Sequence, residues 1–122
     1  MKIAVTSSGE TPDSQIDPRF GRAAYFLIGE SEGNEFEAVN NESVAAAGGA
    51  GISSAKLVTD AGVEAVLTGN CGPNAERTLR AANVKLYTGL TGTVADAVAL
   101  FRSGKLTEAA GPNVPSHSGM QR

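Results

Sequence analysis

Short apolar runs separated by polar, glycine-containing segments dominate the first 40 positions of the chain. Ile3-Ala4-Val5 and the run 24–28 are typical of buried strands, and Phe36 to Val39 alternates between apolar and polar positions as a third strand does. The intervening segment 29–35 has the glycine and polar residues of a turn. We therefore expect the second and third strands to form an antiparallel hairpin.

Farther along, apolar residues recur at helical spacing. A helix is predicted after the small-residue segment 45–51, and Gly62 is well placed to end it. Its predicted inward face consists of Ile52, Ala55, Val58 and Ala61. A fourth strand is expected over 63–67, and the next helix is expected near Pro73, since proline is tolerated in a first helical turn. The inward face of that helix is predicted to consist of Ala75, Thr78, Leu79 and Ala82.

A fifth strand is expected over 84–87, followed by a last helix. Thr93 is its predicted N-cap, and Asp96 three residues on completes an acidic form of the capping box. The buried stripe of this helix is predicted to consist of Val94, Ala97, Val98 and Phe101, with Gly104 ending it. Three successive strand-to-helix units indicate an α/β fold with a largely parallel sheet covered on both faces, which the opening hairpin makes mixed.

The length of 122 residues suits one domain. We expect that domain over 1–106 and a flexible tail over 107–122, which holds prolines, glycines and a polar end. A net charge of -3 without a basic cluster disfavours nucleic acid as a partner. The N-terminal apolar run is too short for a signal peptide, and no segment is long enough to span a membrane, so we expect a cytoplasmic protein.

The polar connections are the places where chemistry is expected. In an open α/β sheet, ligands bind beyond the carboxyl ends of strands, where loops and helix N-termini meet. Four segments are predicted to lie there: 7–22, 48–53, 69–74 and 89–93. The last three place glycine beside free N–H groups at a helix start, an arrangement that favours anions. The first is too long for a simple connection and adds Arg19 and Arg22.

Each of these signals also has a purely structural interpretation. A tight turn into a helix explains the glycines of 48–51 equally well, and the chain has neither a P-loop nor a dinucleotide-binding motif. Arg19 and Arg22 could be solvated surface residues. Cys71 is the single cysteine and precedes a helix start, where the helix dipole is expected to lower its thiol pKa and favour metal ligation, but a small residue in a turn is an equal alternative. His117, the single histidine, lies in the tail, and no catalytic set can be assembled around it.

Four motifs in order carry a resemblance to a known family. They are Asp17-Pro18-Arg19-Phe20-Gly21-Arg22-Ala23, Gly49-Ala50-Gly51-Ile52, Thr68-Gly69-Asn70-Cys71-Gly72-Pro73-Asn74-Ala75 and Thr91-Gly92-Thr93-Val94. Over residues 1–106 the chain resembles dinitrogenase iron-molybdenum cofactor biosynthesis proteins, the nitrogenase accessory factors. This resemblance implies a three-layer, ribonuclease H-like domain with a five-stranded mixed sheet and helices on both faces.

Members of that family resemble carriers that hold iron-molybdenum cofactor, its iron-sulfur precursor or molybdenum-copper sulfide clusters and pass them between assembly proteins. The resemblance therefore implies a binding protein for an anionic metal-sulfur cluster, not an enzyme, with cluster donor and acceptor proteins as partners. The expected cofactor-binding residues are Arg19, Phe20, Gly21, Arg22, Gly49, Gly51, Asn70, Gly72, Asn74, Gly92 and Thr93, with Cys71 as a metal ligand.

Two other function classes use the same features. A regulatory module that binds a small molecule or phosphate would employ the same glycine-rich helix starts. A ribonuclease H-like nuclease follows only from analogy of fold, and the carboxylates Asp13, Asp17, Asp60 and Asp96 do not gather on strands as a two-metal site requires.

Overall fold

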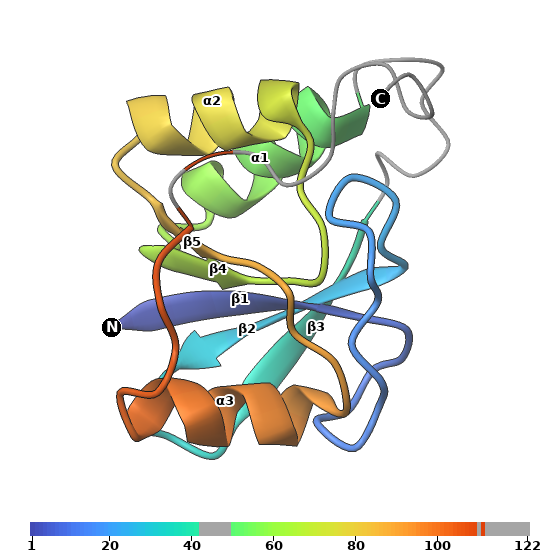
Figure 1. Ribbon diagram of the computed structural model, residues 1–122. Coiled ribbons are helices and arrows are strands. Elements are labelled where there is room, and N and C mark those ends of the chain that lie inside the picture. The colour runs from blue at the N-terminus through green and yellow to red at the C-terminus, as the bar shows by residue number, and fades with distance from the viewer. Residues whose placement is uncertain (42–49, 110, 112–122) are drawn as a thin grey trace, which may run out of the picture.

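The computed structural model describes residues 1–41, 50–109 and 111, and it contains one five-stranded sheet with three helices (Figure 1). The strands are β1 (Lys2–Ser7), β2 (Tyr25–Glu30), β3 (Phe36–Asn40), β4 (Ala65–Leu67) and β5 (Lys85–Tyr87). The helices are α1 (Ala50–Asp60), α2 (Pro73–Ala81) and α3 (Val94–Arg102). The predicted tail beyond residue 111 and the glycines at 48 and 49 lie outside the described residues.

The sheet has the order β3-β2-β1-β4-β5 and is mixed. β2 pairs antiparallel with both β1 and β3, which confirms the predicted hairpin, whereas β4 pairs parallel with β1 and β5. The expected five-stranded mixed sheet is confirmed, but antiparallel pairs are as numerous as parallel ones in the described part of the chain, so the expectation that the sheet is largely parallel was wrong. The physical reason is the long loop after β1, which reverses the chain and returns β2 against β1.

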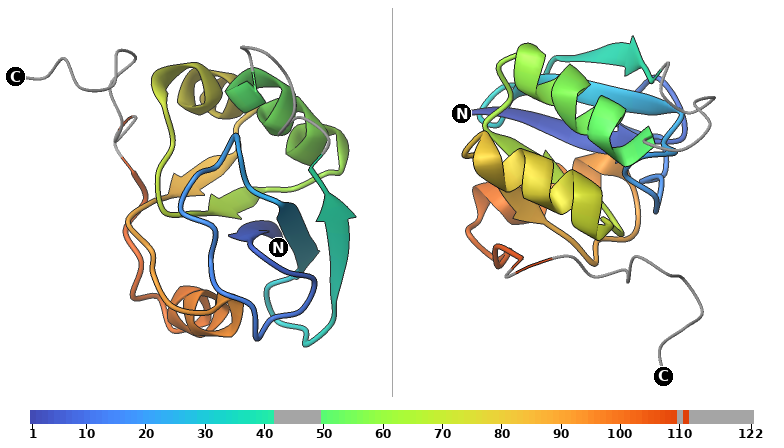
Figure 2. Two further views of the ribbon diagram at one scale, coloured as in Figure 1. Left: turned by 90° about the vertical axis from the view of Figure 1, so that its right-hand side faces the viewer. Right: turned by 90° about the horizontal axis from the view of Figure 1, so that it is seen from above.

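The sheet is the middle of three layers. α1 and α2 lie side by side on one face and α3 covers the other (Figures 1 and 2), which confirms helices on both faces. β1 contributes side chains to the cores on both faces of the sheet, because successive strand residues point in opposite directions. Ala4 belongs to the core under α1 and α2, and Ile3 and Val5 belong to the core over α3.

Two helix faces differ from their predictions. On the predicted inward face of α1, Ala55 and Val58 are buried and Ala61 packs against the core, which confirms them, whereas Ile52 is 42% exposed. Ser54 is buried in addition. Gly51 lies close to α2, since a Cβ there would lie 3.2 Å from the Cβ of Ala75. In α2, Ala82 is exposed beyond the helix end, while Glu76 is buried and forms an ion pair with Arg80.

The predicted start and end of α3 are confirmed. Thr93 accepts a hydrogen bond from the Asp96 amide, and the Asp96 side chain accepts one from the Thr93 amide, which together make the capping box. Gly62 and Gly104 follow α1 and α3 with φ of 82° and 72°, the left-handed conformation that glycine adopts without strain.

The segment after α3 crosses the outer edge of β5. Leu106 packs into the α3-side core, whereas Ala109 packs against the core on the other face and donates its amide to the Leu86 carbonyl at 2.7 Å. Within 1–41 and 50–109, no helix has the length and apolar character required to cross a bilayer.

Candidate functional site

The loop between β1 and β2 lies across the carboxyl ends of the central strands. Asn70, just after β4, donates its amide to the Pro18 carbonyl at 2.7 Å and accepts the Phe20 amide at 3.0 Å, so Arg19 and Asn70 form a parallel bridge. Gly69 makes this crossing possible, because a Cβ there would lie 2.8 Å from the Cα of Pro18. Segment 89–93 is joined as well, since Ile16 donates its amide to the Gly92 carbonyl at 2.9 Å and Gly89 donates its amide to the Gly69 carbonyl at 2.8 Å. Three of the four predicted segments are therefore connected through their backbones.

A buried carboxylate shapes the arginine-containing part of the loop. Asp17 is only 7% exposed, and its two carboxylate oxygens accept the amides of Arg19 at 3.1 Å and Ala24 at 3.3 Å. Its backbone is fixed to β1, since the Thr6 hydroxyl donates to the Asp17 carbonyl at 2.8 Å. Asp17 thus closes residues 17–24 into a compact turn.

A second polar contact supports the same turn from beneath. Asn41, fully buried after β3, donates its side-chain amide to the carbonyls of Gly21 at 3.3 Å and Ala23 at 2.9 Å. Ser54 of α1, also fully buried, has its hydroxyl 3.3 Å from the Gly21 carbonyl and 3.2 Å from the Asn41 side-chain oxygen. We call residues 19–22 the arginine turn, and Asp17, Asn41 and Ser54 are the side chains that support it.

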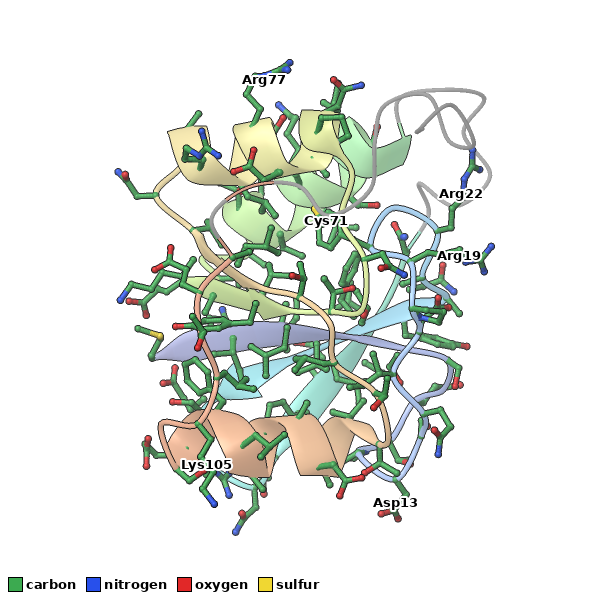
Figure 3. The ribbon with its side chains drawn as sticks, in the orientation of Figure 1. Asp13, Arg19, Arg22, Cys71, Arg77 and Lys105 are labelled. Carbon is green, nitrogen blue, oxygen red and sulfur yellow. The ribbon has the colours of Figure 1, made fainter. Side chains whose placement is uncertain are left out.

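The arginine turn presents two cations at the surface. The Arg19 side chain is 65% exposed, with its Nε 3.7 Å from the Asp17 carboxylate, and Arg22 is exposed as well. Figure 3 shows both side chains extending from the same edge of the molecule, while Arg77 extends from the outer face of α2. A positive edge next to the start of α2 is suited to an anion.

The start of α2 has the open character expected of an anion site. Gly72 is its N-cap, and among described residues no side chain caps it. Gly72 has φ -78° and ψ 175°, which any residue adopts, and a Cβ there would meet nothing within 4 Å. Neither backbone strain nor packing within the described part of the chain explains this glycine. Asn74, in the first turn, is exposed.

The start of α3 is different, and the expectation of free N–H groups there was wrong. Val94 and Ala95 donate their amides to the carbonyls of Ser14 and Pro12, both at 2.9 Å. The capping box uses the amides of Thr93 and Asp96. α3 itself lies on the opposite face of the sheet from α2 (Figure 2), but the segment before it contacts the first loop, because Ile16, next to Asp17, donates its amide to the Gly92 carbonyl at 2.9 Å. A ligand role for Gly92 and Thr93 stays a prediction.

Two other predicted site residues belong to the core. Phe20 is 1% exposed, and its ring lies 5.4 Å from that of Phe26. Cys71 is 2% exposed, and burial, with the charge of Glu76 adding to it, raises the pKa of the thiol to about 12. The expected lowering of this pKa was wrong, because loss of solvent outweighs the helix dipole.

The remaining predicted glycines divide between packing and site geometry. Gly51 is the contact between α1 and α2 described above, and Gly21 supplies a carbonyl to Asn41 and Ser54. Gly49 lies outside the described residues, as does His117. Within the part of the chain that the structure describes, no three histidine, cysteine or acidic side chains gather around a possible metal position.

The sequence interpretation missed the residues that hold the arginine turn. Asp17 belongs to the first of the four motifs but is not among the predicted site residues, and Asn41 and Ser54 belong to neither group. Asn41 follows a strand, where asparagine usually indicates a turn. Ser54 could have been found, because it lies three residues after Gly51 on the helix face that packs inward.

Comparisons with known proteins agree with one another. The family model of dinitrogenase iron-molybdenum cofactor matches residues 1–104. A protein of Methanocaldococcus jannaschii, described only as uncharacterized, is 31% identical over 109 residues, covering 87% of this chain and 89% of its own.

Solved structures extend the likeness to the fold. The apo form of the orange protein from Desulfovibrio gigas has a TM-score of 0.89 and 42% identity, covering 92% of this chain and 95% of its own. A Thermotoga protein of the DUF35 family, whose description assigns it provisionally to NifB, has a TM-score of 0.76 and 38% identity, covering 88% and 91%. Because the family model matches residues 1–104, this chain belongs to the dinitrogenase iron-molybdenum cofactor family.

Proposed function

We propose that this chain binds an anionic metal-sulfur cluster as cargo at the edge formed by the arginine turn and the start of α2. The cargo is iron-molybdenum cofactor, its iron-sulfur precursor or a related molybdenum or iron sulfide. The protein acts as a cytoplasmic binding protein in cluster assembly or transfer and not as an enzyme. Its partners are the proteins that deliver and receive the cluster.

The backbone bridge between Arg19 and Asn70 carries this proposal, since it holds the arginine turn beside an uncapped helix start. Sulfide and oxide ligands give such clusters negative charge at their surface. Guanidinium groups and backbone amides bind anions through charge-assisted hydrogen bonds, which are shorter and stronger than neutral ones. Gly72 leaves space for a ligand to approach the amides of the first turn of α2.

The predicted residues have different roles in this proposal. Arg19 and Arg22 supply charge, and Asn70, Gly72 and Asn74 line the adjoining edge. Phe20, Gly21 and Gly51 position these groups from within the fold. Cys71 is a buried thiol in the structure described, so we assign the first contact with the cluster to charge and amides and not to sulfur.

The comparisons support the ligand class. The family is described by the iron-molybdenum cofactor of dinitrogenase, and an apo form of the orange protein implies a form of that protein with something bound. The ribonuclease H-like classification implied by the resemblance also remains part of the proposal, since the sheet order and layers establish only a mixed α/β fold.

The test is an anaerobic titration of the protein with tetrathiomolybdate, followed by amide NMR and by elemental analysis after desalting. We expect shifts at the amides of 19–22, 70–72, 74 and 75, and retained molybdenum. Replacing both arginines (Arg19→Ala with Arg22→Ala) should weaken retention by about tenfold or more, because each charged hydrogen bond contributes about 1.5–3 kcal/mol.

A matched control removes two positive charges from another part of the surface. Arg77 and Lys105 lie away from the arginine turn (Figure 3), and the double variant Arg77→Ala with Lys105→Ala should retain molybdenum as the native protein does. Equal losses in both double variants would mean that net charge, and not this site, governs binding. No retained metal, together with shifts on adding phosphate, would instead support a phosphate-binding regulatory module.

A further inference from the structure

Two buried polar side chains, those of Asn41 and Ser54, lie beneath the arginine turn. Asn41 and Ser54 are both fully buried, one after β3 and the other on the inward face of α1. Burying an amide and a hydroxyl is unfavourable unless their hydrogen bonds are made. Here those bonds converge on the carbonyls of Gly21 and Ala23, which flank Arg22 in the chain.

The contacts of Asn41 match what an asparagine amide offers. Its NH₂ group has two donors, and two carbonyls, those of Gly21 and Ala23, accept them. The Asn41 backbone amide donates in addition to the Ala24 carbonyl at 3.1 Å. One residue therefore holds three carbonyls of the segment that carries Arg22.

Asp17 provides the complementary contacts from the other side. Its carboxylate accepts the amides of Arg19, in the turn, and of Ala24, just after it. The side chain of Asn41 donates to the carbonyls of Gly21 and Ala23, which lie between those two residues. The turn backbone is thus fixed by an acceptor and a donor side chain, neither of which is exposed. Only the arginine side chains are left to face solvent.

We propose that Asn41 and Ser54 are positioning residues that hold the arginine turn in its ligand-receiving conformation before the ligand arrives. This inference rests on the proposed function of the same edge. Preorganisation reduces the conformational entropy that binding must remove, so an ordered turn raises affinity without a new contact. Ser54 also links the turn to α1, because its hydroxyl lies within hydrogen-bond distance of both Gly21 and Asn41.

The first measurement is hydrogen exchange in the apo-protein, which does not depend on any ligand. In Asn41→Ala we expect exchange at the amides of Phe20 and Ala24 to accelerate by about tenfold, while Val5 in β1 keeps its native rate. Ser54→Ala should show the same change to a smaller extent, and it keeps the test valid if Asn41→Ala folds poorly. Unchanged exchange in both variants would overturn the proposal.

A pH profile separates positioning from simple packing. Asn41→Asp keeps the shape but replaces two donors with acceptors that face carbonyl oxygens, so the turn should be disordered at about pH 8. Protonation restores one O–H donor, so the protection of the Phe20 and Ala24 amides, measured relative to the base-catalysed rate of an unstructured amide at the same pH, should increase again at about pH 5. The native turn should show no such reversal. A variant with equal disorder at both pH values would argue against the donor role.

Metal retention then connects the turn to the site. Asn41→Ala should retain tetrathiomolybdate several-fold less well, whereas Val98→Ala, which weakens the α3-side core away from the turn, should retain it as the native protein does. If the native protein retains no metal but exchange still accelerates in Asn41→Ala, the proposed function fails and the support of the turn stands. If exchange accelerates and retention is unchanged, the turn is not the binding element and the positioning role is overturned.

Discussion

At the scale of single residues, Cys71 shows how burial decides reactivity. Its sulfur belongs to the core cluster that also contains Phe20, Ala75 and Leu79, and its pKa is raised from the ordinary value of 9.0 to about 12. At neutral pH the described thiol is protonated. The neutral thiol is a weak ligand and a weak nucleophile, so a metal-ligating thiolate would require Cys71 to become more exposed than it is here.

The raised pKa predicts how stability depends on pH. The folded protein holds the thiol proton more tightly than the unfolded chain, so this contribution is complete below pH 9 and is lost as the pH rises from about 9 toward about 12. The loss amounts to at most about 1.4 kcal/mol per pH unit. Urea unfolding of the native protein and of Cys71→Ala over this alkaline range should show the steeper decline only in the native protein. Parallel declines would contradict a buried, protonated thiol.

At the scale of elements, the starts of α2 and α3 differ in how the N–H groups of the first turn are capped. α3 satisfies its own first turn through Thr93, Asp96 and the carbonyls of Ser14 and Pro12. α2 begins at Gly72 and Pro73 without a side-chain cap among the described residues. The two helices resemble each other in sequence, since each follows a glycine-containing segment, but only α2 leaves its N-terminus open toward the arginine turn.

Substitution at Gly72 tests whether that open space serves a ligand. Gly72→Ala places a methyl group where nothing lies within 4 Å, so the protein should fold, with a loss of about 1 kcal/mol or less for the poorer N-cap. Retention of tetrathiomolybdate should nevertheless fall. Gly69→Ala is the contrasting variant, because its methyl group would meet the Pro18 backbone and both stability and retention should fall. Native retention in Gly72→Ala would show that the ligand does not occupy this space.

At the scale of the whole molecule, the segment after α3 ties the two faces of the sheet together. Leu106 packs in the α3-side core and Ala109 packs against the other core. The Ala109 amide also donates to the Leu86 carbonyl of the edge strand β5. An edge strand with unpaired backbone groups is prone to pair with another chain. The segment therefore protects β5 in addition to packing against the core.

Two truncations test this role and the predicted domain boundary. Ending the chain after Leu106 should lower the free energy of unfolding by about 1 kcal/mol or more, since the Ala109 hydrogen bond and its packing are lost. It should also increase association at high concentration, measured by sedimentation. Ending the chain after Gly111 keeps the segment and should leave both quantities near their native values. Equal behaviour of the two truncations would support a domain that is complete at residue 106.

The positions of most elements could be predicted because local pattern governs them. The hairpin of β2 and β3 follows from alternation and a turn, and the capping box of α3 follows from Thr93 and Asp96 three residues apart. Most of the inward face of α1 follows from the helical period, but the exposure of Ile52 could not be predicted, since Ile52 fits that period while Gly51 beside it contacts α2. Such a choice between neighbouring faces depends on the shape of the partner helix.

The sequence by itself determined the strand and helix order, the cations of the long loop and the likeness to the family. Those features depend on residue type and spacing, which local physical chemistry fixes. Tertiary structure alone decided that Asp17, Asn41 and Ser54 hold the arginine turn, that the first loop accepts the amides of the first turn of α3 and that the pKa of Cys71 is raised. Each of these outcomes depends on which groups from distant parts of the chain meet, and on how much water they exclude when they do.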